Sequence, residues 1–328
     1  MVKQILRFAG VFCLSMVLTG FHGVGFAKEV VLYSSNQPEL IAMVSRGFEG
    51  KTGIKVSAVR LGTGEAMKRI QAERDNPLGD VFWSGDVAVL DNAKKNFMPY
   101  KSPEAKVLPS NYVEKEGLWT STNVHIMIIM YNKKLVSESE KPLAWKDLFL
   151  PKWKGKIVMA NPEKSGSAYA QVYGLYKLYG WDGLKKLIDN AKILDSSSLI
   201  YKGTAEGEYS LGITMEYAAY RYIAGGSKDV GILYPQEGAF DAPEGAAILK
   251  NCKHPEEAKT FFDYLLSKDV EREILQKHYR RPARPDVPIL EGLPRMSDIK
   301  LMKGFDPIEA NALEKEILKQ WKEIILSR

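Results

Sequence analysis

The chain of 328 residues is poor in the residue types that build disulfide scaffolds and metal sites. It has two cysteines, Cys13 and Cys252, and its histidines at 125, 254 and 278 are far apart. No metal-ligand spacing links any of these residues. A GxSxG elbow and a Ser/His/Asp arrangement are also missing. The sequence therefore gives no support to a zinc protein or a serine hydrolase, and we interpret Cys252 as a buried lone thiol.

Clustered charge and long apolar runs are scarce as well. The net charge is +6, but the lysines and arginines do not gather into the basic patch typical of nucleic-acid binding. Beyond the N-terminal region, no stretch approaches the roughly 20 apolar residues that a membrane span needs. About 300 residues suffice for a core that is stable without disulfides, and this length usually means two domains.

The N-terminal 27 residues have the three-part layout of a secretory signal peptide. Lys3 and Arg7 precede an apolar run at 8–18, and "GFA" offers small residues before a cut after Ala27. The alternative is a membrane anchor, for which the run is too short. Removing residues 1–27 takes away two basic residues and no acidic ones, which lowers the net charge from +6 to +4. We expect an exported, periplasmic protein with Cys252 as its one remaining cysteine.

Short β-branched segments alternate with segments of helical periodicity in the first third of the chain. Residues 29–35, 54–60 and 80–85 have the composition of strands, and 38–53 and 64–77 have that of helices. This βαβαβ order predicts an α/β fold with a parallel sheet. The pattern recurs later. The further expected strands are 125–132, 155–162, 209–215 and 230–235, and the further helices are 167–180, 216–226, 255–266, 269–278 and one from Pro307 onward.

Two α/β lobes with two strand-like crossings, near 123–130 and 232–240, fit this order. We expect a discontinuous lobe 1 made of residues 28–127 and 236–328, and a lobe 2 made of residues 128–235. Ligands bind at such lobe junctions, in the cleft between the domains.

Polar and small residues follow the expected strands, where ligands sit in open α/β sheets. The exits read "SSNQ" at 34–37, "GTGE" at 62–65, "SGD" at 84–86, "KSGSAY" at 164–169 and "MEY" at 215–217. The candidate ligand-binding residues are Ser34, Ser35, Asn36, Thr63, Gly64, Trp83, Ser84, Ser165, Gly166, Ser167, Glu216 and Tyr217.

The segment "KSGSAY" is the sharpest of these exits because it opens a helix. Ser165 and Ser167 supply hydroxyls there, and the first backbone N–H groups of the helix lack intrahelical partners. Such a site suits a phosphate, phosphonate, carboxylate or carbonate group. The alternative is a serine N-cap that needs no ligand.

Two other segments are rich in functional side chains. In "EYAAYRY" we expect Glu216 and Tyr217, in the first helical turn, to face the ligand, and Tyr220 and Tyr222 to serve packing. We interpret "RRPARP" at 280–285 as an exposed loop, because its prolines favour an extended, solvated chain. The alternative for this run is a contact with a membrane partner.

The pieces "VVLYSSNQPELIAMVSRGFEGKTGIKV", "GDVFWSGD", "PKWKGKIVMANPEKSGSAY" and "APEGAAILKNCKHPEEAKTFFDYLLSK" resemble family 1 extracellular solute-binding proteins of ABC importers. The resemblance spans residues 29–275 and is closest to the branch of ferric-ion-binding proteins and their relatives for phosphorylated sugars and phosphonates. It implies the type 2 periplasmic-binding-protein fold, with two lobes, two crossovers and hinge closure on the ligand, and a membrane permease as partner.

The resemblance also implies a test for iron. Ferric binders of the family carry a histidine at the position of Gln37, a glutamate at that of Gly85, and a tyrosine pair where this chain has Tyr217 followed by Ala218. One ligand of four survives, although Asp86 and Glu216 could add oxygen donors. If the ligand were iron, Tyr217 and Glu216 would hold it.

The stretch Ser165–Ser167, which holds the anion in ferric binders, is intact. We therefore expect a small anionic organic ligand whose phosphate or phosphonate lies on Ser165–Ser167 and Thr63. Glu216 would meet its amine or hydroxyls, and Trp83 and Tyr217 would pack on its body. The resemblance implies a monomeric binding protein with no cofactor and no nucleic-acid partner. The alternatives are a ferric-ion receptor, an exported α/β enzyme using Glu216 or Asp86 as acid or base, and a sensor that presents ligand to a membrane receptor.

Overall fold

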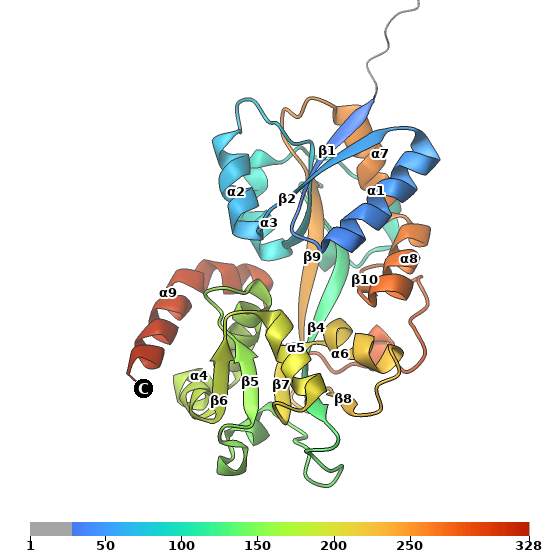
Figure 1. Ribbon diagram of the computed structural model, residues 1–328. Helices are drawn as coiled ribbons and strands as arrows, with labels where there is room; N and C mark the ends of the chain where they lie inside the picture. The colour runs from blue at the N-terminus through green and yellow to red at the C-terminus, as the bar shows by residue number, and fades with distance from the viewer. Residues whose placement is uncertain (1–27, 328) are drawn as a thin grey trace, which may run out of the picture.

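The structure, a computed structural model, describes residues 28–327, so the predicted signal peptide at 1–27 lies outside the described residues. Two α/β lobes stand one above the other and share two long strands (Figure 1). None of the helices within 28–327 combines the length and the hydrophobicity that a membrane crossing needs. The strands are β1 (Glu29–Ser34), β2 (Lys55–Arg60), β3 (Val81–Asp86), β4 (Thr120–Asn132), β5 (Ile157–Ala160), β6 (Ala191–Leu194), β7 (Leu211–Met215), β8 (Val230–Leu233), β9 (Phe240–Ile248) and β10 (Arg281–Pro282). The helices are α1 (Pro38–Thr52), α2 (Thr63–Ala72), α3 (Val87–Ala93), α4 (Gly166–Asn190), α5 (Ser197–Glu206), α6 (Glu216–Ala224), α7 (Pro255–Leu266), α8 (Lys268–His278) and α9 (Pro307–Leu326).

The upper lobe is built on the predicted βαβαβ unit. Strand β1 pairs in parallel with β2 on one side and with β3 on the other. Helix α1 starts at Pro38, whose missing N–H suits the first helical turn, and ends at Gly53, whose φ of 72° terminates it. Because all three parallel strands end on the same side, the loops after them meet at one edge of the sheet.

The lower lobe has β5 between β6 and β7, all parallel. Helix α4 begins as predicted, with Ser165 as its N-cap, but it continues to Asn190 rather than ending near 180. Gly180 has φ 61° and ψ −168° and breaks the helical geometry there without ending the helical segment. Helix α5 was not predicted, because it begins within a serine-rich sequence at 196–198.

Strands β4 and β9 connect the lobes, and they pair with each other antiparallel over Thr120–Met127 and Phe240–Ala246. Beyond this overlap β4 pairs with β7 in the lower lobe, and β9 pairs with β3 in the upper lobe. The second crossing was predicted at 232–240 and is wrong by several residues. Residues 230–233 form β8 on the lower part of β4, and the true crossing strand contains Pro243 and Gly245, which hid its β pattern.

The apolar residues form two large separate clusters, one in each lobe. The prediction assigned all of residues 236–328 to lobe 1. The stripe of α9, with Ile317, Trp321 and Ile324, instead packs in the cluster of the lower lobe. This follows from its 3.6-residue periodicity, which presents one apolar face to α4. The other lobe boundaries stay a prediction.

We predict that Trp321→Ala lowers the free energy of unfolding by about 3–5 kcal/mol, because the side chain is fully buried and its removal leaves a cavity. Urea denaturation measures the loss. The matched control is Leu326→Ala on the same helix, where the side chain is 76% exposed and little change is expected. Equal stability of the Trp321→Ala variant and the wild type would show that α9 is not docked.

Candidate functional site

A cleft of ≈ 930 Å³ lies between the lobes and is lined by both of them. Eight of the twelve predicted residues border it, and they come from the segments after β1, β2 and β5, from the end of β3 and from the first turn of α6. These residues are Ser35, Thr63, Gly64, Ser84, Ser165, Gly166, Ser167 and Tyr217.

The other four predicted residues do not border the cleft. The Ser34 hydroxyl accepts the N–H of Asn36 beneath the surface, and Trp83 donates from its indole N–H to Thr122. Asn36 is buried, but its carbonyl accepts a hydrogen bond from Arg60 Nε at 3.0 Å and so holds Arg60 at the cleft. Ser34 and Trp83 lie beneath the cleft because alternate residues of a strand point to opposite faces, and their contact with a ligand stays a prediction. The fourth residue is Glu216.

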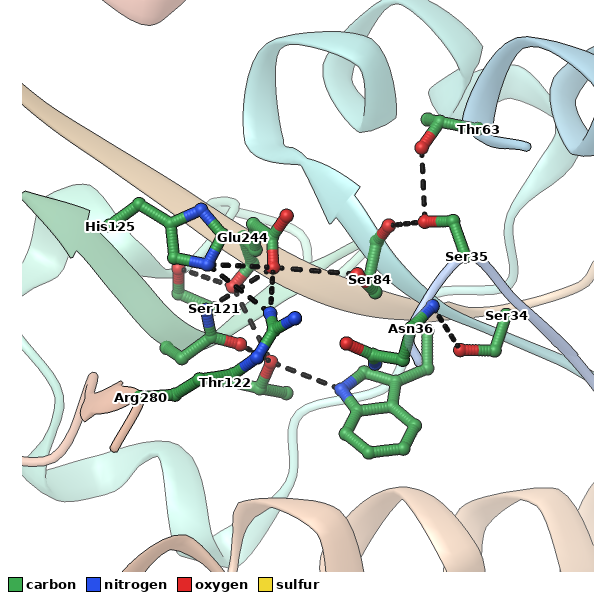
Figure 2. Close-up of polar contacts among 12 residues, drawn as sticks. Ser34, Ser35, Asn36, Thr63, Ser84, Ser121, Thr122, His125, Glu244 and Arg280 are labelled. Atoms are coloured by element: carbon green, nitrogen blue, oxygen red, sulfur yellow. Dashed lines mark hydrogen bonds and ion pairs between the residues drawn. The ribbon is translucent and has the colours of Figure 1, made fainter. Parts of the chain in front are cut away.

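On the upper side of the cleft, three hydroxyl residues form one group. Ser35 lies between the other two (Figure 2): its Oγ receives a hydrogen bond from Thr63 Oγ1 at 3.0 Å and donates to the carbonyl of Ser84. Thr63 begins α2, whose first N–H groups have no intrahelical acceptor. A Cβ added at Gly64 would meet no atom within 4 Å, so space is open beside this helix end.

Ser84 has a φ of 80°, a left-handed conformation that is uncommon for a residue with a side chain. The register between β3 and β9 shifts here, between Trp83 and Gly85. Such backbone costs on the order of 1–3 kcal/mol and clusters at functional sites. At this bulge the Ser84 carbonyl accepts the hydrogen bond from Ser35. The Ser84 hydroxyl lies 3.4 Å from Glu244 Oε2.

On the lower side, three serines form a triangle that we call the serine cradle: Ser165, Ser167 and Ser197. Their hydroxyl oxygens are 2.6–3.2 Å apart. Ser165 caps α4 and Ser197 opens α5, so two helix N-termini with unpaired N–H groups converge on one point. Ser197 was not predicted, because α5 was not recognised as a helix.

The cradle and the Ser35–Thr63–Ser84 group lie on opposite lobes, and no hydrogen bond within the described residues joins them. The sequence-based expectation placed one phosphate on Ser165–Ser167 and Thr63 together. The structure separates these residues into two polar ends of one cleft.

The floor between the two ends carries a charge cluster on the crossing strands. Glu244 of β9 accepts hydrogen bonds from Arg280 Nη1 at 2.8 Å and Asn123 at 3.2 Å, and His125 Nε2 is 3.3 Å away (Figure 2). The Arg280 guanidinium also lies over the ring of Tyr217, 5.1 Å from its centroid. Glu244, His125 and Arg280 all border the cleft and were not predicted.

The protonation states of the floor follow from burial and these contacts. Burial lowers the pKa of His125 to about 4, with a further contribution from Arg280, so the imidazole is neutral at pH 7. Burial alone would raise the pKa of Glu244, but His125, Arg280 and the hydrogen bonds outweigh it and hold that pKa below its usual value. Burial raises the pKa of Tyr217, so its phenol stays protonated at neutral pH.

The prediction that Glu216 faces the ligand is corrected by its contacts. Its carboxylate receives two hydrogen bonds from Arg281, at 3.1 and 2.7 Å, and a third from the Tyr234 hydroxyl at 2.6 Å. Glu216 is 1% exposed and does not border the cleft. Its role is to tie the start of α6 to β10.

The interpretation of "RRPARP" as an exposed loop is also wrong. Arg280, Arg281 and Arg284 are all buried, and each meets a carboxylate: Glu244, Glu216 and Asp286 respectively. Arg280 and Arg281 point to opposite sides because they are adjacent in an extended segment. The even distribution of charge in the sequence gave no sign of these long-range pairs. Tyr220 and Tyr222 pack as expected, against Tyr279 and Tyr201.

The positions implied for iron are only partly assembled. Gln37, Asp86 and Tyr217 border the cleft, but Gly85 cannot ligate and Ala218 is buried. Among residues 28–327, no group of three or more His, Cys, Asp or Glu is arranged to hold a metal ion. The Arg280 charge beside Tyr217 opposes a cation there.

We predict that Glu216→Gln destabilises the protein by about 3–5 kcal/mol, because it leaves the Arg281 charge buried and uncompensated. Chemical denaturation measures the loss. The double variant Glu216→Leu/Arg281→Met should recover most of it, since both charges are gone. An unchanged stability of Glu216→Gln would mean that the carboxylate is free of the pair.

A second prediction concerns Asp86, whose pKa is raised to about 7 by burial, with contributions from Glu244 and Glu314. The unfolded value is about 4, so the folded state binds the proton more tightly, and stability is lost as pH rises from about 4 through 7. Asp86→Asn keeps the cap on Ala88 N and removes the half-buried charge. The variant should be more stable than the wild type by about 1–3 kcal/mol at pH 8 and nearly equal to it at pH 4. A thermal-denaturation series in pH checks this, and a difference independent of pH would contradict it.

Comparison with known proteins bears out the resemblance. A sequence profile described as "Bacterial extracellular solute-binding protein" matches residues 76–302. The chain is 24% identical over 269 residues to the Fe(3+)-binding periplasmic protein of Serratia marcescens, covering 77% of this chain and 78% of that one. It is 24% identical over 255 residues to the putative 2-aminoethylphosphonate-binding periplasmic protein of Salmonella typhimurium, covering 73% of each.

The structure of AfuA from Actinobacillus pleuropneumoniae with fructose-6-phosphate superimposes with a TM-score of 0.81 at 25% identity, over 91% of this chain and 98% of that one. The two-lobed fold is therefore that of periplasmic binding proteins, and the chain belongs to the family of bacterial extracellular solute-binding proteins.

Proposed function

We propose that this chain is the exported binding protein of an ABC importer and captures a small organic solute carrying a phosphate or phosphonate group. The single observation that carries the proposal is the serine cradle. Three hydroxyls and the starts of two helices converge on one point of the interlobe cleft. Hydroxyl and backbone N–H donors with the positive ends of helix dipoles favour an anion there.

Room and charge at the cradle support an anionic group. A Cβ added at Gly166 would meet no atom within 4 Å, so the α4 end faces open space. The N–H groups of Gly166, Ser167 and Ser197 have no acceptor among the described residues. Across the cleft, Arg60 has no carboxylate partner in the described chain and adds an uncompensated positive charge.

The floor supports an organic body in addition to the anion. Glu244 and Arg280 offer an acceptor and a donor side by side, and the neutral His125 and Tyr217 rings contact each other at an interplanar angle of 39°, with centroids 5.0 Å apart. Such a surface suits hydroxyl or amine groups on a small carbon skeleton. Glu244 thus takes the role that the sequence suggested for Glu216.

Three relatives suggest candidate ligands for this chain. Two are named for binding ferric ion and 2-aminoethylphosphonate, and the structure of the third contains fructose-6-phosphate. The Arg280 charge above the Tyr217 ring, and an alanine at 218 in place of a second tyrosine, disfavour iron in this chain. Within residues 28–327, the cradle hydroxyls hydrogen-bond one another and the Ala168 N–H, and none of them contacts the base that a nucleophile would need, so we propose binding rather than catalysis.

The mechanism that we propose is lobe closure. Each lobe carries one polar end of the cleft, and β4 and β9 run from one lobe to the other through a continuous sheet (Figure 1). A ligand that reaches both ends stabilises the closed form and shifts the equilibrium towards it. The closed monomer then delivers the solute to a permease in the membrane.

We expect fructose 6-phosphate or 2-aminoethylphosphonate to raise the melting temperature by several degrees, since saturating ligand adds about 3 kcal/mol at 100 times Kd. Fructose and ethanolamine, which lack the anionic group, should give no shift. Differential scanning fluorimetry measures both.

Ser167→Trp should abolish the ligand-induced shift because the indole fills the cradle, while the melting temperature without ligand stays close to that of the wild type. Ser198→Trp is the matched control, because Ser198 is exposed on α5 and does not border the cleft. An undiminished shift in Ser167→Trp would remove the cradle from the site. Absence of any shift with phosphorylated or phosphonate solutes, together with a visible charge-transfer band after ferric loading, would favour the iron receptor.

A further inference from the structure

The C-terminal helix α9 contributes a face to the cleft. Asn311, Glu314 and Leu318 border the cleft, and their spacing places them on one side of the helix. The match to the family profile ends at residue 302, before α9 begins, so the profile says nothing about the residues that this helix presents to the cleft.

Helix α9 is held firmly to the lower lobe. Its apolar stripe packs in the lower core, Lys177 pairs with Glu309 at 2.7 Å, and the Tyr169 hydroxyl donates to the carbonyl of Ala310. These contacts use the side of α9 that faces α4. The cleft-facing residues are consequently fixed in position.

The same helix reaches the upper lobe. Asn311 Nδ2 donates to the carbonyl of Ala88 in α3 at 2.9 Å. In Figure 1, α9 runs along the lower lobe and passes beneath α2 and α3. It therefore spans the side of the cleft where the two lobes would otherwise be separated by solvent.

Glu314 lies in the middle of this wall and makes no hydrogen bond or ion pair with any residue of 28–327. Burial raises the pKa of its carboxyl. Glu314 and Glu244 of β9 both contribute to the raised pKa of nearby Asp86. The negative charges of Glu314 and Asp86 in turn contribute to the raised pKa of Tyr169 on α4. Asp86, Glu244 and Glu314 make this side acidic, with Lys95 beyond the end of α3 as the cation that also borders the cleft, whereas the cradle side offers donors.

We propose that α9 is a specificity-determining wall of the cleft, in which Glu314 excludes solutes that carry a second negative charge. This inference rests on the proposed function and narrows it to solutes with a single phosphate or phosphonate. The physical reason is that two like charges brought together in a partly desolvated site cost several kcal/mol. The cradle can satisfy one anionic group, but a second one directed towards α3 would meet the carboxylate of Glu314, which has no partner among the described residues.

The test compares two solutes that differ by one phosphate, fructose 6-phosphate and fructose 1,6-bisphosphate, by isothermal titration calorimetry at pH 8. Wild type should prefer the monophosphate by at least tenfold. Glu314→Gln should reduce this preference by about tenfold or more, mainly by improving bisphosphate affinity. The matched control Glu316→Gln, at an exposed position of α9 outside the cleft, should keep the wild-type ratio. An unchanged ratio in Glu314→Gln would overturn the proposal.

A measurement without ligand separates this proposal from the proposed function. Carboxyl-detected NMR titration should show a lower pKa for Asp86 in Glu314→Gln than in the wild type, because a neighbouring negative charge is gone. An unchanged Asp86 pKa would show that Glu314 does not face the cleft and would overturn the proposal even if no solute binds. A lowered Asp86 pKa with no binding of any phosphorylated solute would instead contradict the proposed function and leave the wall in place.

Discussion

The antiparallel pairing of β4 with β9 is the constraint on which the rest of this structure depends. Each strand is long enough to belong to both lobes, and their shared ladder joins the strands of the two lobes into one continuous sheet. All of β4 is buried, so neither strand can be shortened or exposed without opening a core. The cleft exists because two cores form on either side of this ladder.

The same pair carries the floor of the site. His125 comes from β4 and Glu244 from β9. Ser84, which has a left-handed backbone at the bulge of β3, contacts Glu244 through its hydroxyl. A residue keeps an unfavourable backbone conformation only where the contacts of the surrounding structure hold it there. Arg280 pairs with Glu244 and so balances its charge at the floor of the cleft. Its neighbour Arg281 pairs with Glu216 on the other side of the extended segment.

Sequence patterns predicted the features that depend on local order. The strand exits, the capped start of α4 and the βαβαβ unit are recognisable because hydrophobic periodicity, prolines and serines act within a few residues. Eight of the predicted site residues consequently border the cleft. The second crossing strand escaped prediction because Pro243 and Gly245 interrupt its β pattern for reasons of close packing: a Cβ on Gly245 would lie 2.5 Å from the carbonyl of Thr120.

The features that failed to be predicted depend on contacts across the sequence. Glu216 and Arg281 are 65 residues apart, and nothing local marks them as partners. Arg280 and Glu244 reach the floor only after the segments that carry them dock on β4. Ser197 belongs to the cradle, but it lies at the start of α5, whose sequence does not indicate a helix. Helix α9, which forms one side of the cleft, lies more than 100 residues further along the chain.

The central claim is that the cradle of Ser165, Ser167 and Ser197 binds the phosphate or phosphonate of an organic solute. Native mass spectrometry of the protein after incubation with a bacterial metabolite extract and gel filtration tests it most directly. The account predicts retention of one phosphorus-containing small molecule per chain, and its loss when Ser167 is replaced by Trp. Retention of a ferric ion, or failure to retain any phosphorus-containing molecule, would contradict it.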